Sequence, residues 1–188
     1  MSKKDEEIKA ERQVRRWLES CVVGLHLCPF ARVPFEQGRV RIEACFESSL
    51  LESGYFFKNE LETLMNSSSE VLETSLLLFC PQAFDDFEKF LDFVDEMALL
   101  IESNELSDDV QLVAFHPNYQ FEGEEENARS NYTNRSPCPI IHIIRQDSMA
   151  RAIAAYGEEN TDEIPHANIR RLGALTLEEF RALFLSLD

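Results

Sequence analysis

The chain has 188 residues, of which 44% are hydrophobic and 28% charged, which is typical of one globular domain and argues against a disordered or fibrous chain. Its net charge of −17 at pH 7 disfavours binding of nucleic acids or anionic membranes through the bulk surface. No signal-peptide core and no apolar run of membrane-spanning length is evident, and five cysteines without a CxxC pair are typical of reduced thiols. We therefore expect a cytoplasmic protein.

The spacing of apolar residues predicts the elements of the first half of the chain. A stripe at helical spacing, from Val14 to Leu25, predicts a helix over residues 5–25 that Pro29 terminates. Alternation over residues 40–46 predicts a strand with one polar face, and a helix with Phe57 and Leu61 on its apolar side follows it. The continuous apolar run 74–80 predicts a central strand that is buried on both faces.

The second half continues the alternation of strands and helices. We expect a helix over 87–101, a strand over 110–116, a long loop over 117–139 and a strand over 140–145. Asp147 is expected to cap a helix that Gly157 ends. Two short helices close the chain; the first runs from about Pro165 to Gly173, and the second opens with a capping box at 176–179 and buries Leu177, Phe180 and either Leu183 or Phe184.

The order of these elements predicts the fold class. Strands that alternate with helices, without a repeat or a linker, indicate one α/β or α+β domain over residues 1–188. We expect a small sheet of about four strands with helices packed on it, the fourth strand being joined through the long loop.

A basic, Asn-rich segment is the clearest candidate for a site. Residues 129–146 hold Arg129, Arg135 and Arg145 and no acidic residue, so this part of the chain could hold a carboxylate or phosphate group. The alternative is that these arginines pair with the neighbouring glutamates at 124–126, while the Asn and Thr side chains satisfy the loop backbone.

Two histidines lie at strand positions next to this segment. His142 lies among four isoleucines, where burial disfavours its charged form and leaves a neutral imidazole suited to a general base, or simply a hydrogen-bonded core residue. His116 ends the preceding strand on the face of Leu112 and Ala114, and contact with His142 across neighbouring strands is feasible. Strand alternation puts His142 and Arg145 on opposite faces.

Cys28 is the candidate thiol. It lies in the segment Leu27-Cys28-Pro29-Phe30-Ala31 after the first helix, where it either reacts as a nucleophile or packs as a structural thiol. Cys28, His116, Cys138 and His142 also offer metal ligands, without a recognised spacing. No motif of the sequence identifies a cofactor.

Three stretches carry a resemblance to a known family. They are residues 27–31, residues 111–121 with His116-Pro117-Asn118-Tyr119, and residues 131–137 with His142 and Arg145; Ile164-Pro165 and Asn168-Ile169 extend them. With these stretches the chain resembles the bacterial domain-of-unknown-function family 1415. The resemblance implies that the motifs surround one site, and it implies no reaction. Cys138 departs from the family pattern, which usually has an aromatic residue there.

Three hypotheses follow for the function. The first is an enzyme, or a former enzyme, acting on a small anionic metabolite: Arg135, joined by Arg41 or Arg145, holds the anion, Asn131, Thr133, Asn134 and Tyr119 contact it, His116 or His142 moves a proton, and Cys28 lines the site or acts as the thiol. The second is a non-catalytic binding or regulatory module with an acidic surface. The third is a Cys/His metal protein.

Overall fold

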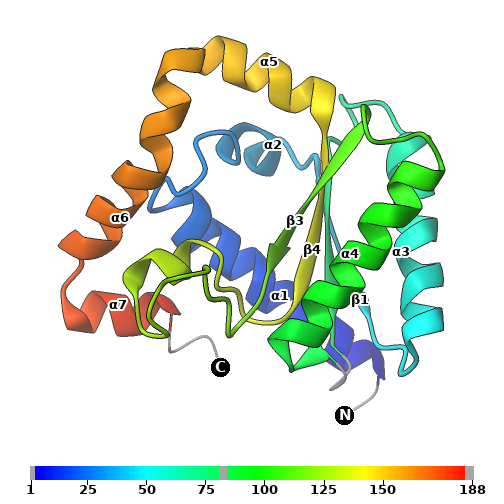
Figure 1. The fold of residues 1–188 in the computed structure, drawn as a ribbon, viewed down its shortest axis with the longest axis horizontal. Helices are drawn as coiled ribbons and strands as arrows, with labels where there is room; N and C mark the ends of the chain where they lie inside the picture. Colours follow the sequence, from blue (N-terminus) through cyan, green and yellow to red (C-terminus); the bar gives the residue numbers. More distant parts are fainter. Residues whose placement is uncertain (1–2, 81–83, 185–188) are drawn as a thin grey trace.

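The computed structural model describes residues 3–80 and 84–184 and contains a mixed sheet of four strands (Figure 1). The strands are β1 (Val40–Cys45), β2 (Thr74–Phe79), β3 (Val110–Phe115) and β4 (Ile140–Arg145), in the order β1-β2-β4-β3. All six residues of β2 are buried, which confirms the central strand predicted from its continuous apolar run.

The connections explain this strand order. Helix α3 (Leu50–Met65) links β1 to β2, which are parallel and so need a crossover. Helix α4 (Phe87–Ser103) carries the chain from β2 to β3 and leaves a gap between them. The long loop then returns the chain as β4, which fills that gap antiparallel to both neighbours. The fourth strand is thus joined through the long loop, as predicted.

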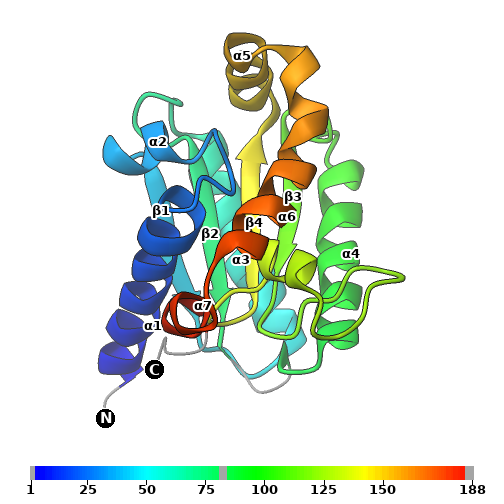
Figure 2. The same cartoon turned by 90° about the vertical axis from the view of Figure 1, so that its left-hand side faces the viewer.

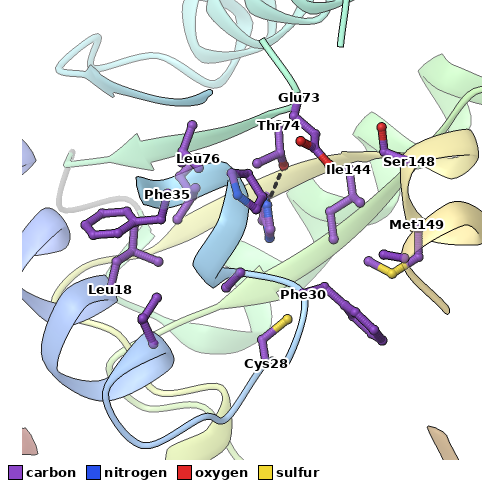
Figure 3. Close-up of a pocket in the computed structure, with 16 residues that line it drawn as sticks. Leu18, Cys28, Phe30, Phe35, Glu73, Thr74, Leu76, Ile144, Ser148 and Met149 are labelled. Carbon is purple, nitrogen blue, oxygen red and sulfur yellow. Dashed lines mark hydrogen bonds between the residues drawn. The ribbon is translucent and has the colours of Figure 1, made fainter. Parts of the chain in front are cut away.

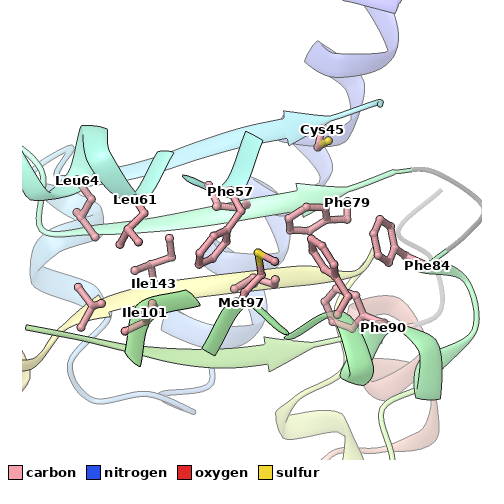
Figure 4. Close-up of a cluster of buried hydrophobic side chains, with 14 of the residues drawn as sticks. Cys45, Phe57, Leu61, Leu64, Phe79, Phe84, Phe90, Met97, Ile101 and Ile143 are labelled. Atoms are coloured by element: carbon pink, nitrogen blue, oxygen red, sulfur yellow. The ribbon is translucent and has the colours of Figure 1, made fainter. Parts of the chain in front are cut away.

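Helices α3 and α4 cover one face of the sheet with an aromatic core (Figure 4). The rings of Phe79, Phe84 and Phe93 lie close together, with centroids 5.2 Å apart for Phe79 and Phe93 and 4.9 Å apart for Phe84 and Phe93. The richness of the sequence in phenylalanine is therefore explained largely by core packing.

The opposite face is covered by α1 (Lys3–Trp17), the π-helical segment η1 (Leu18–Val23) and the short helix α2 (Arg32–Glu36). The helix predicted over 5–25 therefore widens into a π-helix and ends earlier. A Cβ on Gly24 would lie 2.3 Å from the carbonyl oxygen of Ser20, so only glycine fits this close approach. His26 then turns the chain with a φ of 53°.

The C-terminal helices stand beside the sheet (Figures 1 and 2). They are α5 (Gln146–Tyr156), the 3₁₀ segment η4 (Glu158–Glu163), α6 (Ile164–Ala174) and α7 (Leu177–Phe184). Figure 2 shows α6 opposite β4 and β3. The segment predicted as an irregular loop contains a 3₁₀ helix, η3 (Arg129–Thr133), which shares an apolar cluster with α6 and α7.

The predicted helix ends are partly correct. Gly157 ends α5 with a φ of 95°, and Thr176 and Glu179 form the predicted capping box. Asp147 does not cap α5, because the helix begins at Gln146 and its N-cap is Arg145. Asp147 lies within the first turn and forms an ion pair with Arg151. Leu177 is 60% exposed, so its predicted burial is wrong, whereas Phe180 is buried.

The overall architecture agrees with the predicted fold class, a four-stranded sheet with helices on it. Within residues 3–80 and 84–184, helices long and apolar enough to cross a bilayer are absent.

Candidate functional site

His142 lies on the face of the sheet that α1, η1 and α2 cover, and one of its ring nitrogens is unpaired among the described residues. It lies on β4 opposite Leu76 of β2 and Val113 of β3. Its Nε2 atom is 2.5 Å from the hydroxyl of Thr74, which donates its single proton to the carbonyl of Ile143 at 2.7 Å. The Thr74 oxygen must therefore accept a hydrogen bond from His142, so Nε2 carries the ring proton and Nδ1 is the free acceptor.

The charge state of His142 follows from its surroundings. Burial in an apolar environment lowers the pKa of His142 to about 4. The ring is therefore neutral at pH 7, in agreement with the expectation from the isoleucines around it. Among the described residues Nδ1 has no hydrogen-bond partner, so its lone pair is available to a bound molecule.

A cavity of about 90 Å³ lies beside His142, between the sheet, α2 and α5. Figure 3 shows Thr74 and Glu73 on one side of it, Cys28 and Phe30 on another, and Ser148 and Met149 of α5 on a third. The remaining walls are mostly apolar side chains: Leu18, Val23, Ala31, Pro34, Phe35, Val40, Leu76, Ile144 and Ala152. Its volume corresponds to about three water molecules in the liquid, enough for one small chemical group.

Cys28 lies on the opposite wall of this cavity. The chain reaches it through the turn at His26, and α6 holds that turn, because the Asn168 amide donates to the carbonyl of Leu27 at 2.7 Å. The backbone N–H groups of Phe30 and Ala31 donate hydrogen bonds to the thiol and favour its thiolate, but burial has the larger effect and raises the pKa of Cys28. The thiol is therefore protonated at neutral pH.

Cys28 also lines a second, larger groove of about 560 Å³. This groove continues along the same sheet face over Val113 and Phe115 of β3, and α6 forms its opposite wall. Its rim is formed by residues of the long loop and of α6, namely Phe121, Glu122, Glu124, Ser130, Thr133, Asn134, Ile164, Pro165, Asn168 and Ile169. Each stretch that carries the family resemblance contributes a residue to this groove or to the cavity.

The electrostatic character of the cavity and the groove is neutral to acidic. Of the described residues that line them, none is lysine or arginine. Glu73 lines the cavity and is neutralised by Arg39 at 2.6 Å, whereas Glu122 and Glu124 are exposed at the rim of the groove. The combined site therefore offers an anion no opposite charge.

The arginines that we expected to hold an anion are bound elsewhere. Arg135 donates to the backbone carbonyls of Tyr119 and Glu126, and its guanidinium lies 4.5 Å from the centre of the Tyr132 ring. Arg135 thus binds the backbone of the loop. Both interpretations from the sequence differ from this: one was an anion site, and the other was pairing with the glutamate side chains at 124–126.

Arg145 and Arg41 lie on the other face of the sheet. Arg145 donates to the carbonyls of Leu64, Ser67 and Leu72, where α3 ends and the chain enters β2. Arg41 pairs with Glu60 of α3 at 2.7 Å. The predicted separation of His142 from Arg145 is confirmed, and neither arginine reaches the cavity.

His116 is buried, and both of its ring nitrogens have backbone partners. It is 1% exposed and contacts Phe87 and Phe90 of α4, on the face opposite to His142. Its Nδ1 accepts from the N–H of Asn118 at 3.0 Å, so Nε2 donates to the carbonyl of Phe84 at 2.8 Å. Burial lowers the pKa of His116. The two histidines therefore do not contact each other, although the sequence made such a contact feasible. His116 does lie on the face of Leu112 and Ala114, as predicted.

The polar residues of the long loop mostly satisfy its own backbone. Asn131 is fully buried, accepts from the N–H of Phe121 and donates to the carbonyls of Glu125 and Glu126. Tyr119 packs between the rings of Phe87 and Phe121, and burial raises the pKa of its hydroxyl.

Thr133 and Asn134 have a mixed role. The Thr133 hydroxyl donates to the carbonyl of Ser130 at 2.8 Å, and the Asn134 amide donates to the carbonyl of Ala114 at 3.2 Å. Both residues nevertheless line the groove. Of the predicted site residues, the structure therefore brings together Cys28 and His142 at the cavity, with Thr133 and Asn134 along the groove.

Sequence reasoning missed the contribution of the C-terminal helices. Ser148, Met149 and Ala152 of α5 line the cavity, and Asn168 of α6 lines the groove. No pattern in α5 marks these positions. Ile164-Pro165 and Asn168-Ile169 were part of the resemblance, and that signal could have assigned them to the site.

The four metal ligands suggested by the sequence, Cys28, His116, Cys138 and His142, do not meet at one point. His116 and His142 point to opposite faces of the sheet, and in the described part of the chain no three His, Cys, Asp or Glu side chains are grouped to hold an ion. Cys138 instead lies next to Cys80.

Comparison with known proteins gives one finding. The family model described as "Protein of unknown function (DUF1415)" matches residues 9–182. Neither the curated proteins nor the solved structures contain a match.

Proposed function

This chain belongs to the family of unknown function DUF1415, and we propose that it binds a small neutral or cationic molecule in the combined cavity and groove. The observation that carries this proposal is the convergence of segments far apart in the sequence on one site. Residues 27–31, the long loop, β4 and α6 all reach it, and ligand sites are typically concave, mostly apolar and equipped with a few polar groups.

The geometry defines the class of ligand. The cavity takes one small, largely apolar group that carries a single N–H or O–H, and Nδ1 of His142 accepts the hydrogen bond from that donor. The rest of the molecule extends past Cys28 into the groove, where Asn134 and Asn168 lie near the acidic rim. An anionic ligand, as in our first hypothesis, is disfavoured, because it would meet Glu122 and Glu124 without a basic partner.

Recognition is better supported than covalent catalysis. Cys28 and His142 line the same cavity, and a thiol nucleophile needs such a base within hydrogen-bond reach. However, burial raises the pKa of Cys28 and lowers that of His142, so both shifts oppose the thiolate–imidazolium pair. His142 with a pKa of about 4 is a weak base but a good hydrogen-bond acceptor.

The test uses three probes of matched size: benzyl alcohol, benzylamine and benzoate. Binding is followed by the ¹⁵N signals of the His142 ring. We expect benzyl alcohol and benzylamine to shift Nδ1, whereas benzoate, which is anionic and lacks a donor, should bind at least about tenfold more weakly.

A pair of variants on α5 locates the binding. Ala152 lines the cavity and Ala154 faces solvent, so Ala152→Phe should abolish the shifts and Ala154→Phe should preserve them. If benzoate bound most tightly, or if both variants weakened binding equally, the proposed site would be wrong.

A further inference from the structure

Two thiols, Cys80 and Cys138, lie close together at the end of the sheet where β2 ends and β4 begins. Cys80 directly follows β2 and Cys138 lies two residues before β4. The antiparallel register pairs Leu78 with Ile140, and the N–H of Phe79 donates to the carbonyl of Pro139 at 2.9 Å. One step further along the same register, Cys80 lies opposite Cys138.

The position of this pair in the ladder brings the two thiols together. Because Phe79 and Pro139 form the hydrogen-bonded position, Cys80 and Cys138 occupy the next, non-hydrogen-bonded position. Cα atoms at such positions are about 4.5 Å apart, and disulfides span Cα distances of roughly 4.4–6.8 Å. Both side chains pack against the same cluster as Leu78 and Ile140, so they share a face of the sheet.

The two thiols also differ in acidity in the way that an attacking and a resolving thiol do. The S–H of Cys138 donates to Cys80, which lowers the pKa of Cys80 and raises the pKa of Cys138 well above its usual range. Burial raises the pKa of each of the other three cysteines, Cys21, Cys28 and Cys45. Cys80 is thus the cysteine with the most thiolate character.

Reagents can reach this pair from solvent. Cys80 and Cys138 are half-buried and line a surface cavity of about 340 Å³. Lys9, Glu6 and Asp85 are the charged residues of its walls. By contrast, Cys21 and Cys45 are buried and donate to the carbonyl of Leu183 and the hydroxyl of Ser53.

We propose that Cys80 and Cys138 form a redox-active dithiol that closes to an intramolecular disulfide. A peroxide ROOH oxidises the Cys80 thiolate to a sulfenic acid and leaves as the alkoxide RO⁻ (hydroxide when the peroxide is H₂O₂). The Cys138 sulfur then attacks the Cys80 sulfur and forms the S–S bond, while the S–O bond breaks and the sulfenic hydroxyl leaves as hydroxide, which takes up the Cys138 proton to become water. This site is separate from the His142 cavity and does not depend on the function proposed above.

The experiment treats the fully reduced protein with one equivalent of H₂O₂, followed by N-ethylmaleimide, intact mass measurement and peptide mapping. We expect the number of alkylated cysteines to fall from the five in the sequence to about three, with a Cys80–Cys138 cross-link that dithiothreitol reverses. Cys28→Ser should form the same cross-link, and Cys80→Ser should form none. Cys138→Ser should accumulate a Cys80 sulfenic acid that dimedone traps.

Two results would overturn the proposal. One is oxidation of Cys80 to a sulfinic acid in the wild type without a cross-link, and the other is a disulfide that joins a different pair. The wild-type protein alone decides between these outcomes, so the proposal stays testable if a Cys80 variant fails to fold.

Discussion

The pH dependence of stability tests the charge state assigned to His142. Burial lowers its pKa from 6.5 to about 4 in the folded chain, so protons bind the unfolded chain more tightly. Stability from the neutral ring is fully present above pH 6.5 and is lost as the pH falls toward 4. Between about pH 7.5 and about pH 5.5 these two pKa values give a loss of about 1.3 kcal/mol in the free energy of unfolding.

The perturbation is His142→Gln, whose side-chain amide can still donate to Thr74 but does not titrate. Urea unfolding is followed by the fluorescence of the buried Trp17 at both pH values, which lie above the isoelectric point of 4.6. Carboxylates and His116 titrate in both proteins, so the difference between wild type and variant isolates His142. The wild type should lose about 1.3 kcal/mol more than the variant. Equal losses would refute the assignment of a neutral ring with a lowered pKa.

Four further outcomes follow from the contacts. Arg145→Leu should cost about 3 kcal/mol in urea unfolding, because three backbone carbonyls lose a charged donor, whereas Arg151→Leu at an exposed ion pair should change stability little. Ser75→Ala should raise stability by about 1 kcal/mol, since the fully buried Ser75 hydroxyl has no partner among the described residues. Asn131→Ala should cost about 2 kcal/mol and speed proteolysis within residues 117–139, because it removes three hydrogen bonds of the loop and leaves the N–H of Phe121 without its acceptor. A cationic methanethiosulfonate should modify Cys28 faster than an anionic one, because the rim of the groove is acidic. The ratio of the two modification rates, measured by peptide mass spectrometry, should exceed the ratio for the same reagents on a free thiol. Faster modification by the anionic reagent would contradict the acidic groove.

The sequence predicted most of the fold because its signals are local. The last four of the six residues of β2 form an uninterrupted apolar run, and the apolar stripe of α4 is unbroken, so each element could be identified alone. The π-helix η1 was missed, because a stripe of apolar residues does not distinguish a wide turn from an α-helical one. The cap was misassigned by two positions, to Asp147 instead of Arg145, which is within the usual uncertainty of helix ends.

The site was harder to predict, because a polar side chain is available to a ligand only where no backbone group of the fold already pairs with it. Cys28 and His142 were identified from residue type and apolar surroundings, and both line the cavity. Asn131 and His116 have equally suggestive side chains, yet backbone groups distant in the sequence satisfy them. No local pattern reveals those partners, since they are set by the path of the loop.

The arginines explain why the charge of a segment misled the first hypothesis. A guanidinium has five donors in a fixed plane and can satisfy several carbonyls as well as one anion. Arg145 does so where α3 ends, and Arg135 does so within the loop. The arginines of the basic segment 129–146 therefore bind backbone carbonyls, those of the loop in the case of Arg135 and those on the other face of the sheet in the case of Arg145. Arg135 and Arg145 line neither the cavity nor the groove, whereas Glu122 and Glu124 line the groove, so the positive charge of the segment does not reach the place where the first hypothesis needed it.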